Sequence, residues 1–339
     1  MFAEGRPSAA LAQALASSDE QVRCRALRKV ERLLRRRSPA PLTDQAMRRL
    51  WRALYYLLWF ADSPPLIDRT IERLCSWMRV SVDTWLYFQV LWETVCRYWL
   101  EIDHLRLDKY YALLNRALGM AVQVCGDRVE EWRHLARIIE QVVLGPVAGT
   151  STTQTLNDSP NALGVALHLC DKWLDTVLLQ TPGGPRTLTF LSHSDRPADL
   201  VMEPFLRLYV AESERASMLQ LRNRKLLMQR AFDRIWQPLV RPPPSPPLST
   251  GEHSKHPVYL TDIEHRQQLA TRLFKRAAGA SVPPLGRKLA YACVRWLHRE
   301  ADLPMSDKNI IGRVMNTRQR RRRRRGRGRQ RRGRHHLRS

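Results

Sequence analysis

The sequence predicts an all-α fold, a HEAT-like α-solenoid in which antiparallel helices stack and a disordered arginine-rich C-terminal tail follows. Three observations favour this class. Glycine is scarce, with 15 among 339 residues. Apolar residues recur at helical rather than alternating spacing through long windows, and short polar connections separate these windows, as in stacked helical pairs. Because 44% of the residues are hydrophobic, the chain can bury a large core, and global disorder is excluded.

The first expected helix covers residues 21–37, where one apolar stripe runs beside several arginines. Ser17 is its expected N-cap, with Glu20 three residues later as in a capping box. Ser63 is expected to cap a later helix that has Pro64 at its first position. The remaining helices are expected near 43–61, 65–79, 82–100, 103–124, 128–144, 161–179, 200–211, 215–236, 261–279 and 286–300.

Composition divides the chain into four parts. They are a helical domain over 1–240, a Pro-rich linker over 241–257, a small helical appendage over 258–317 and a disordered polyarginine tail over 318–339. The linker has polyproline character. The tail has almost nothing to bury, and its like charges repel. Within the first part, the Gly/Ser/Thr-rich stretch 145–159 predicts a loop, and residues 186–191 hint at a strand.

The formal charge of +25 comes from two separate features of the chain. Residues 318–339 contain 13 arginines and no acidic residue. The first 317 residues keep 44 Lys and Arg against 32 Asp and Glu, a charge of +12. A basic body and a polyarginine tail both favour a polyanionic partner.

Cysteine spacing and the length of apolar runs exclude several protein classes. The six cysteines are at least 21 residues apart, so neither C-x-x-C metal pairs nor a dense disulfide framework is present, and we expect reduced thiols. The apolar run 53–61 is too short to cross a bilayer. The N-terminal region has acidic residues and lacks the apolar core of a signal peptide. We therefore expect an intracellular protein without a membrane segment.

Four parts of the sequence, taken in order, carry a resemblance to one family. The first resembles an opening helix pair and reads LAQALASSDEQVRCRALRKVERLL. The second is similar to the signature W-x-x-L-x-Y-x-x-W-x-x-D-x-P and reads LWRALYYLLWFADSPPLIDRTIERL. The third is similar to the most specific string, W-x-x-I-D-x-x-R-x-D-K-[FY]-[FY], and reads WLEIDHLRLDKYYALLNRAL. The last part looks like H-L-x-D-x-x-L and P-F segments and reads GVALHLCDKWLDTV and MEPFLRLYV. Together they span residues 11–236 and resemble the eukaryotic nucleolar ribosomal RNA-processing protein 1 family.

The resemblance implies a function, a compartment and partners. It implies a non-catalytic structural factor in large ribosomal subunit biogenesis, which supports precursor rRNA processing within pre-ribosomal particles in the nucleolus of the nucleus. Its implied partners are large-subunit assembly factors, ribosomal proteins and precursor rRNA, with no cofactor, membrane or small-molecule substrate. The sequence departs from the family at Ala53, where a glycine is usual, and the region after Pro238 matches nothing.

The densest charge cluster lies in the third family segment, and it could be read as a nuclease site. On one helix Asp103 would neighbour Arg106, and Arg106 would neighbour Lys109, but Asp108 would point about 140° away from Asp103. Two carboxylates so placed do not converge, which favours structural ion pairing or partner docking over catalysis. The family-motif residues with this structural or docking role are Trp51, Trp59, Asp62, Trp99, Asp103, Arg106, Asp108 and Lys109.

A second cluster, His168, Asp171 and Asp175, has the spacing i, i+3 and i+7 on one helix. These nitrogen and oxygen donors could hold a divalent metal. No second helix offers matching ligands, so capping or interhelix hydrogen bonding is the favoured interpretation. The sequence contains no GxSxG, Walker A, GxGxxG or HExxH pattern, and we predict no catalytic residue and no metal site.

The abundant aromatic residues could stack on RNA bases, but their spacing favours the core. Trp85, Trp92 and Trp99 recur every seven residues, as on one buried helical stripe. The arginines are more informative about binding. A candidate basic surface on the body, which could equally be a solvated helix face, consists of Arg28, Arg32, Arg35, Arg36, Arg48 and Arg49.

The tail is expected to neutralise RNA phosphates and to act as a nuclear and nucleolar address. Its RNA-binding arginines are Arg318, Arg320, Arg321, Arg322, Arg323, Arg324, Arg325, Arg327, Arg329, Arg331, Arg332 and Arg334. Two alternative functions remain open at this point. One is a general helical adaptor, or a nucleic-acid- or chromatin-associated binding protein of the nucleus. The other is a metal-dependent RNA hydrolase that uses Asp103 and Asp108.

Overall fold

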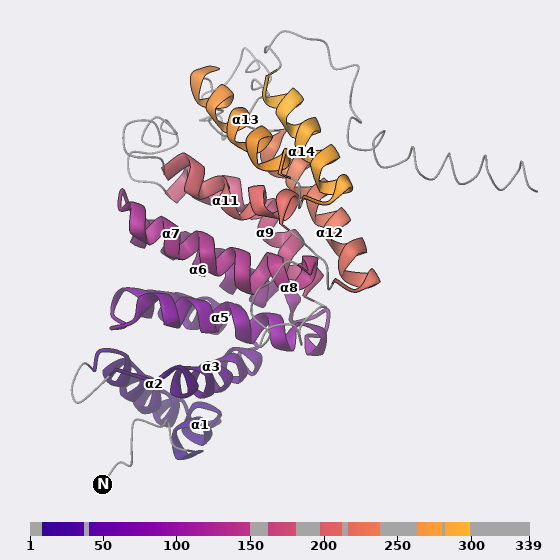
Figure 1. The fold of residues 1–339 in the computed structure, drawn as a ribbon. Helices are drawn as coiled ribbons and strands as arrows, with labels where there is room; N and C mark the ends of the chain where they lie inside the picture. The colour runs from indigo at the N-terminus through magenta and orange to yellow at the C-terminus, as the bar shows by residue number, and fades with distance from the viewer. Residues whose placement is uncertain are drawn as a thin grey trace, which may run out of the picture.

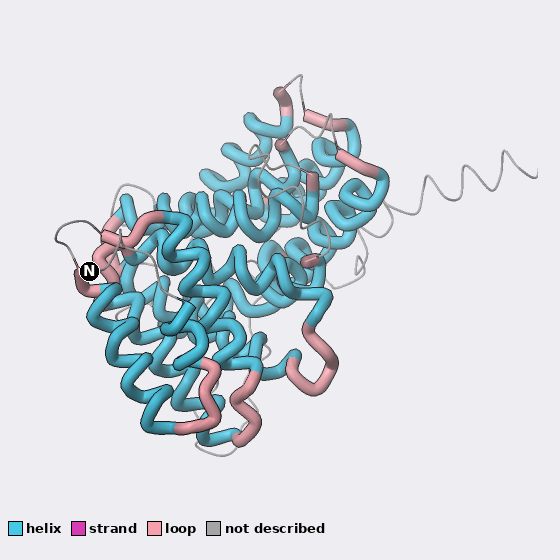
Figure 2. The backbone as a smooth tube through the Cα atoms, turned by 90° about the horizontal axis from the view of Figure 1, so that it is seen from below, coloured by secondary structure: helices cyan, strands magenta, loops and turns pink. Residues whose placement is uncertain are grey.

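The structure, a computed structural model, describes residues 9–36, 41–149, 162–180, 197–211, 216–237, 263–279 and 282–298. Within these ranges the backbone is helical apart from the connections between helices, and none of these residues lies in a strand (Figure 2). The predicted all-α class is therefore confirmed. The strand suggested over 186–191, the linker 241–257 and the tail 318–339 lie outside the described residues.

The helices form two layers that run the length of the stack, from the indigo N-terminal end to the yellow C-terminal end of Figure 1. One layer contains α3 (Asp44–Trp59), α5 (Thr84–Tyr98), α7 (Val129–Ile138), α11 (Pro197–Val210) and α14 (Pro284–Leu297). The other contains α4 (Pro64–Ser76), α6 (Leu107–Cys125), α9 (Leu163–Gln180) and α12 (Met218–Ala231). At the ends, α1 (Ala9–Leu15) packs on α2 (Glu20–Leu34) and α3, and α13 (Ile263–Ala277) packs on α14. None of the helices described is long and apolar enough to cross a lipid bilayer.

Two helix starts show how local chemistry sets the boundaries. The Ser17 prediction is wrong, because Asp19 is the N-cap of α2 and its carboxylate accepts from the backbone N–H of Gln21 at 2.7 Å. A carboxylate is the better cap at the positive end of the helix dipole. Ser17 instead accepts from the Asp19 N–H at 3.2 Å. At the start of α4 the predicted positions are confirmed, with Ser63 as the N-cap residue and Pro64 first in the helix, but the Ser63 side chain makes no capping hydrogen bond.

The loop expected over 145–159 is wrong for residues 145–148, and residues 150–159 lie outside the described residues. After α7, the π-helical segment η3 (Ile139–Leu144) leads directly into α8 (Gly145–Ala148), whose residues are buried. Helical backbone ends at Gly149, which has a φ of +71° that favours glycine. The free energy gained by burying Val147 and Ala148 outweighs the tendency of glycine-rich sequence to form loops.

Tryptophans fill much of the core between the layers. Six of them are fully buried: Trp51, Trp77, Trp92, Trp132, Trp173 and Trp236. Each contributes about 2–3 kcal/mol by leaving water. A tryptophan that is buried in the protein cannot stack on an RNA base. The prediction that the aromatic residues belong to the core is therefore confirmed for Trp92 and Trp99, which are buried. Trp85 is only half-buried.

The last two helices pack directly on the body. Gly286 of α14 approaches α11 so closely that a Cβ there would lie 2.0 Å from the backbone oxygen of Tyr209. Trp296 packs edge-on against Phe232, with ring centroids 5.9 Å apart. Arg276 of α13 forms an ion pair with Glu203 of α11 at 2.7 Å. Helices α13 and α14 are thus held on the body by apolar and ionic contacts.

Candidate functional site

The third family segment folds into a corner where α3 ends and α6 begins. We call it the motif corner and define it as residues 59–62 and 99–109. Its centre is Lys109, whose buried ammonium donates to the backbone oxygens of Trp59 at 2.7 Å and Ala61 at 2.9 Å. These carbonyls close the negative end of α3, where a cation is stabilised. Burial lowers the pKa of Lys109, and the nearby charge of Asp62 opposes that shift.

Asp103 lies in a turn before α6 and not on the helix, which begins at Leu107. The helical geometry expected from residue 103 onward is therefore wrong. One Asp103 oxygen accepts from the N–H groups of Leu105 at 3.0 Å and Arg106 at 3.1 Å, and the other forms an ion pair with the Arg106 guanidinium. These bonds stop the helix from extending backward, because the side chain satisfies backbone donors in a turn. Desolvation raises the pKa of Asp103, but Arg106 more than offsets it and the net shift is downward.

Arg106 makes a second contact, across the corner. Its guanidinium carbon lies 4.7 Å from the centre of the Trp59 ring, within the range of a cation–π interaction. The same residue therefore joins the turn to the end of α3. Asp103 and Lys109 bond to backbone groups, and Arg106 links Asp103 to the Trp59 ring.

The other two motif carboxylates face solvent. Asp62 and Asp108 are both exposed, and Asp103 is held by Arg106 and by backbone. The structure therefore gives Asp103 and Asp108 different environments, and not a shared site. Three large apolar side chains are exposed beside them: Phe60 at 60%, Leu100 at 71% and Leu105 at 79%. We call these three apolar side chains, with the exposed Asp62 and Asp108, the rim of the motif corner.

Aromatic residues connect the motif corner to the core. Tyr110 stacks on Tyr55 with centroids 4.8 Å apart and donates its hydroxyl hydrogen to the Tyr55 backbone oxygen at 3.0 Å. Trp51 is buried against Tyr87, with centroids 4.9 Å apart. Trp99 is also buried, and its ring lies 5.2 Å from that of Tyr111. The motif tryptophans Trp51 and Trp99 thus hold neighbouring helices together.

The cluster of His168, Asp171 and Asp175 makes separate contacts. The His168 ring lies 4.1 Å from the Tyr111 ring, and its Nε2 is 2.8 Å from Asn115 Oδ1. Asp171 forms ion pairs with Arg230 of α12 and with Arg234 of the π-helical η5 (Phe232–Trp236). Asp175 is exposed. The cluster therefore bonds to other helices, and in the described ranges no three His, Cys, Asp or Glu side chains are grouped to hold a metal ion.

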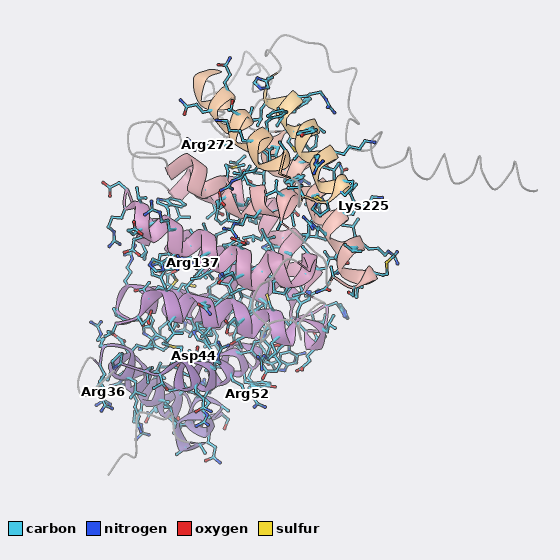
Figure 3. All side chains as sticks on the ribbon, viewed as in Figure 1. Arg36, Asp44, Arg52, Arg137, Lys225 and Arg272 are labelled. Carbon is cyan, nitrogen blue, oxygen red and sulfur yellow. The ribbon has the colours of Figure 1, made fainter. Side chains whose placement is uncertain are left out.

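The candidate basic surface contains side chains in different situations. Arg28, Arg32 and Arg49 are exposed. Arg35 pairs with Glu31 of its own helix at 2.9 Å, and Arg36 is half-buried. Figure 3 shows Arg36 and the further exposed Arg52 at the α2–α3 end of the stack. Arg28, Arg32, Arg49 and Arg52 therefore face solvent at this end of the stack.

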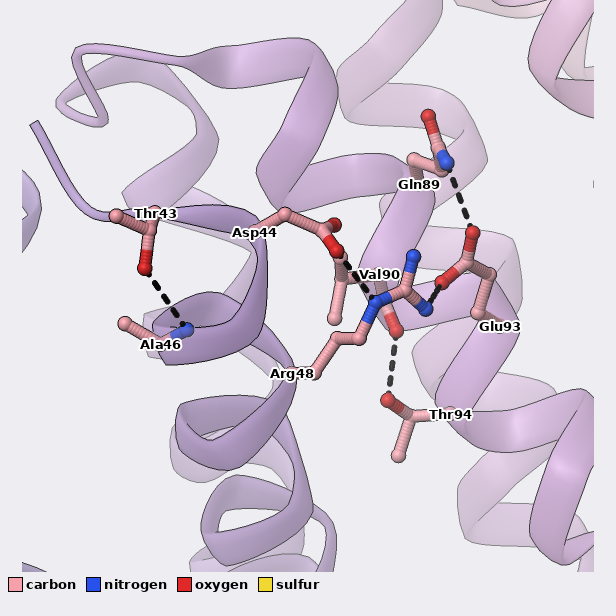
Figure 4. A network of polar contacts seen from close by, with 8 residues as sticks. All are labelled: Thr43, Asp44, Ala46, Arg48, Gln89, Val90, Glu93 and Thr94. Atoms are coloured by element: carbon pink, nitrogen blue, oxygen red, sulfur yellow. Dashed lines mark hydrogen bonds and ion pairs between the residues drawn. The ribbon is translucent and has the colours of Figure 1, made fainter. Parts of the chain in front are cut away.

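Arg48 has a structural contact that the sequence does not reveal. Its guanidinium bridges Asp44, at 2.8 Å on its own helix, and Glu93 of α5 (Figure 4). The Glu93 side chain is 3% exposed, and Gln89 donates to its second oxygen at 2.8 Å. A buried carboxylate needs such a partner, because an unpaired buried charge is strongly destabilising. Arg48 therefore fastens α3 to α5.

Arg224 on α12 is a second buried cation that sequence reasoning missed. It is 3% exposed and donates to backbone oxygens at the end of α11, including Leu208 at 2.9 Å and Ala211 at 2.7 Å. Burial lowers its pKa to about 10. The signal that could have found it is its spacing with Leu227, Met228 and Ala231, which puts an arginine on the apolar face of the helix. The arginines of the tail lie outside the described residues.

The fold and the motif corner together define a class of protein: an all-α helical stack whose most specific sequence motif joins helices and leaves an exposed rim. A comparison with models of known protein families identifies the family to which the chain belongs. Residues 6–247 match the model of a family described as nucleolar protein Nop52, and the chain belongs to this family. The family description confirms the nucleolar assignment that the sequence resemblance implies.

Curated relatives cover part of the chain. Ribosomal RNA processing protein 1 homolog A of Homo sapiens is 29% identical over 175 residues, 50% of this chain and 36% of that protein. Homolog B of Mus musculus is 30% identical over 204 residues, 58% of this chain and 26% of that protein. The homolog of Dictyostelium discoideum is 24% identical over 299 residues, 83% of this chain and 56% of that protein. Each match therefore spans less than two thirds of the relative.

Proposed function

We propose that this chain is a non-catalytic structural factor of large ribosomal subunit biogenesis, which supports processing of precursor rRNA within pre-ribosomal particles. Membership of a nucleolar family and the names of the relatives support the coarse role in ribosomal RNA processing. The finer claim, that the chain acts without breaking bonds, rests on the motif corner.

One observation carries this claim: three of the five charged motif residues, Asp103, Arg106 and Lys109, are engaged in contacts within the corner. Lys109 bonds to two backbone carbonyls, Arg106 lies over Trp59, and Asp103 is held by Arg106 and by backbone N–H groups. A general base must lie within hydrogen-bond reach of the proton that it removes, whereas Asp103 is engaged by Arg106 and by backbone N–H groups. What the corner leaves exposed is a rim of apolar and acidic side chains, including Phe60 and Asp108, which suits protein docking.

In the proposed mechanism, the chain docks at a defined place on the particle, and its binding shifts the conformational equilibrium of the particle. The body docks on large-subunit assembly factors or ribosomal proteins, and the arginines of the tail and of the α2–α3 end add affinity for precursor rRNA. Phosphate contacts position a protein but do not read sequence. A factor that binds the processable conformation of the particle more tightly increases the population of that conformation.

Affinity purification of the tagged full chain tests the proposal. We expect large-subunit assembly factors and precursor rRNA to be enriched together. Recovery of histones, or of clients unrelated to ribosomes, would instead support a chromatin-associated protein or a general helical adaptor. RNase treatment before elution separates protein docking from RNA attachment, and we expect the assembly factors to remain bound.

The rim of the motif corner can be tested in the same purification. Replacing Leu105 and Asp108 by Ser and Ala changes exposed side chains only, so we expect unchanged thermal stability and reduced recovery of assembly factors. The matched control replaces exposed Val82 and Asp127 by Ser and Ala, and it should recover them normally. Equal recovery by both double variants would contradict a docking role for the rim.

A further inference from the structure

The outer face of α12 is unusual in its composition. Nine large apolar side chains are exposed in the described part of the chain, and four of them lie on this one helix. They are Met218 at 76%, Leu219 at 47%, Leu221 at 39% and Leu226 at 52%. Isolated exposed apolar residues are ordinary, but a group on one helix marks an interaction surface.

Helical geometry puts these side chains on one side of α12. At about 100° per residue, the four apolar residues span an arc of about 160°, together with exposed Arg222 and Lys225. The opposite side, which includes Asn223, Leu227 and Ala231, is buried against α8, α9 and α11. We call the exposed side the α12 face. The buried side of α12 makes the contacts with the neighbouring helices, so the α12 face is not needed for packing within the stack.

The backbone under this face is held firmly. Ser217 and Gln220 form a capping box at the start of α12. Gln220 also donates to the Pro146 backbone oxygen at 3.0 Å, which ties the start of the helix to α8. Arg224 fixes the middle of the helix to the end of α11. A preformed surface loses little conformational entropy on binding.

The charge of the α12 face has one sign. The helix contains no Asp or Glu, and Arg222 and Lys225 are both exposed. In Figure 1 one end of α12 projects beyond the neighbouring helices, and Figure 3 places Lys225 at the outer edge of the stack. A partner therefore meets apolar side chains flanked by cations.

We propose that the α12 face binds an acidic amphipathic helix of a partner protein. Apolar anchors at helical spacing would cover the Met and Leu side chains, and flanking Glu or Asp would pair with Arg222 and Lys225. RNA can neutralise the cations but offers no apolar surface to cover the leucines. A second copy related by two-fold symmetry would bring like charges together. The proposal stands apart from the role in rRNA processing, because it uses neither the tail nor the motif corner.

A peptide-binding measurement on the full chain tests this. The probe is a fluorescein-labelled designed helix with leucines at i, i+3, i+7 and i+10 and glutamates beside them. A matched peptide has lysine in place of every glutamate. We expect the acidic peptide to bind with a Kd at least tenfold lower than that of the lysine peptide, measured by fluorescence anisotropy. Equal binding of both peptides, or no binding of the acidic one, would overturn the proposal.

Variants locate the binding. The double variant Leu219→Ser with Leu226→Ser should weaken the acidic peptide at least tenfold, while the control Phe274→Ser, exposed at 50% on α13, should not. The double variant Arg222→Glu with Lys225→Glu should reverse the preference between the two peptides. This variant keeps the apolar residues, so it still tests the site if the serine variant fails to fold. An unchanged Kd in both double variants would overturn the site. Two other results would overturn the proposal: a concentration-dependent dimer that the serine variant does not form, or an RNA oligonucleotide that the serine variant does not bind.

Discussion

At the scale of single residues, Lys109 shows how a charged side chain can be part of the core. Its ammonium group replaces water at two backbone carbonyls that end α3, so the cost of burial is offset by charged hydrogen bonds. Arg224 does the same for the end of α11. Both cations donate to backbone carbonyls at the C-terminal end of a helix, where the dipole is negative.

Lys109→Met removes both hydrogen bonds but keeps the length of the apolar stem. The variant leaves two carbonyls without their donor, so we expect a loss of about 2–4 kcal/mol in the free energy of unfolding. Urea unfolding followed by circular dichroism measures it. Lys288→Met, on an exposed position of α14, is the control and should change the free energy by less than about 0.5 kcal/mol. A Lys109→Met variant as stable as the control would show that the contacts are not structural.

His168 predicts a pH dependence of stability. Burial, followed by the charge of Lys172, lowers its pKa, and the charge of Asp171 opposes the shift. The folded state therefore binds fewer protons than the unfolded state, whose histidine has a pKa of about 6.5. The contribution is complete above that unfolded pKa and is lost as pH falls through the folded pKa. His168→Gln should reduce the fall in Tm between pH 7 and pH 5, measured by differential scanning fluorimetry; parallel curves would contradict this role.

At the scale of helices, two adjacent arginines on α3 have opposite expected roles. Arg48 neutralises buried Glu93, whereas Arg49 is exposed. Arg48→Met should therefore cost about 3 kcal/mol in unfolding free energy, and Arg49→Met less than about 0.5 kcal/mol. Adding Glu93→Gln to Arg48→Met should restore most of the loss, because the buried charge is then removed. Chemical denaturation of these three variants and of the unaltered chain decides this, and equal effects of the two arginine substitutions would contradict it.

The same helices show what the sequence can and cannot predict. Apolar periodicity predicted the order of the helices and the burial of Trp92 and Trp99, because periodicity is local and burial follows from it. It did not predict that Asp103 would start a turn, since the competing hydrogen bonds come from its own side chain. The pairing of Arg48 with Glu93 joins residues 45 positions apart. No local pattern records such a contact.

At the scale of the whole molecule, we expect the helical body and the arginine-rich residues 318–339 to contribute separately to RNA binding. Deleting residues 318–339 removes 13 arginines. If about half of them meet single-stranded RNA phosphates, the slope of log affinity against log salt should become less steep by about 4 to 5. Filter binding at several salt concentrations measures the slope, and nucleolar enrichment should fall with it. The Tm of the body should stay unchanged. Equal RNA affinity and localisation of the two chains would contradict a role for the tail.

If the helical platform acts by docking and not by chemistry, precursor rRNA should remain intact in its presence. Purified full chain is incubated with precursor rRNA and magnesium, and RNA length is followed over time. We expect the RNA to be bound and to stay full length, as it does with Asp108→Asn. Magnesium-dependent cleavage by the unaltered chain, abolished by Asp108→Asn, would contradict it.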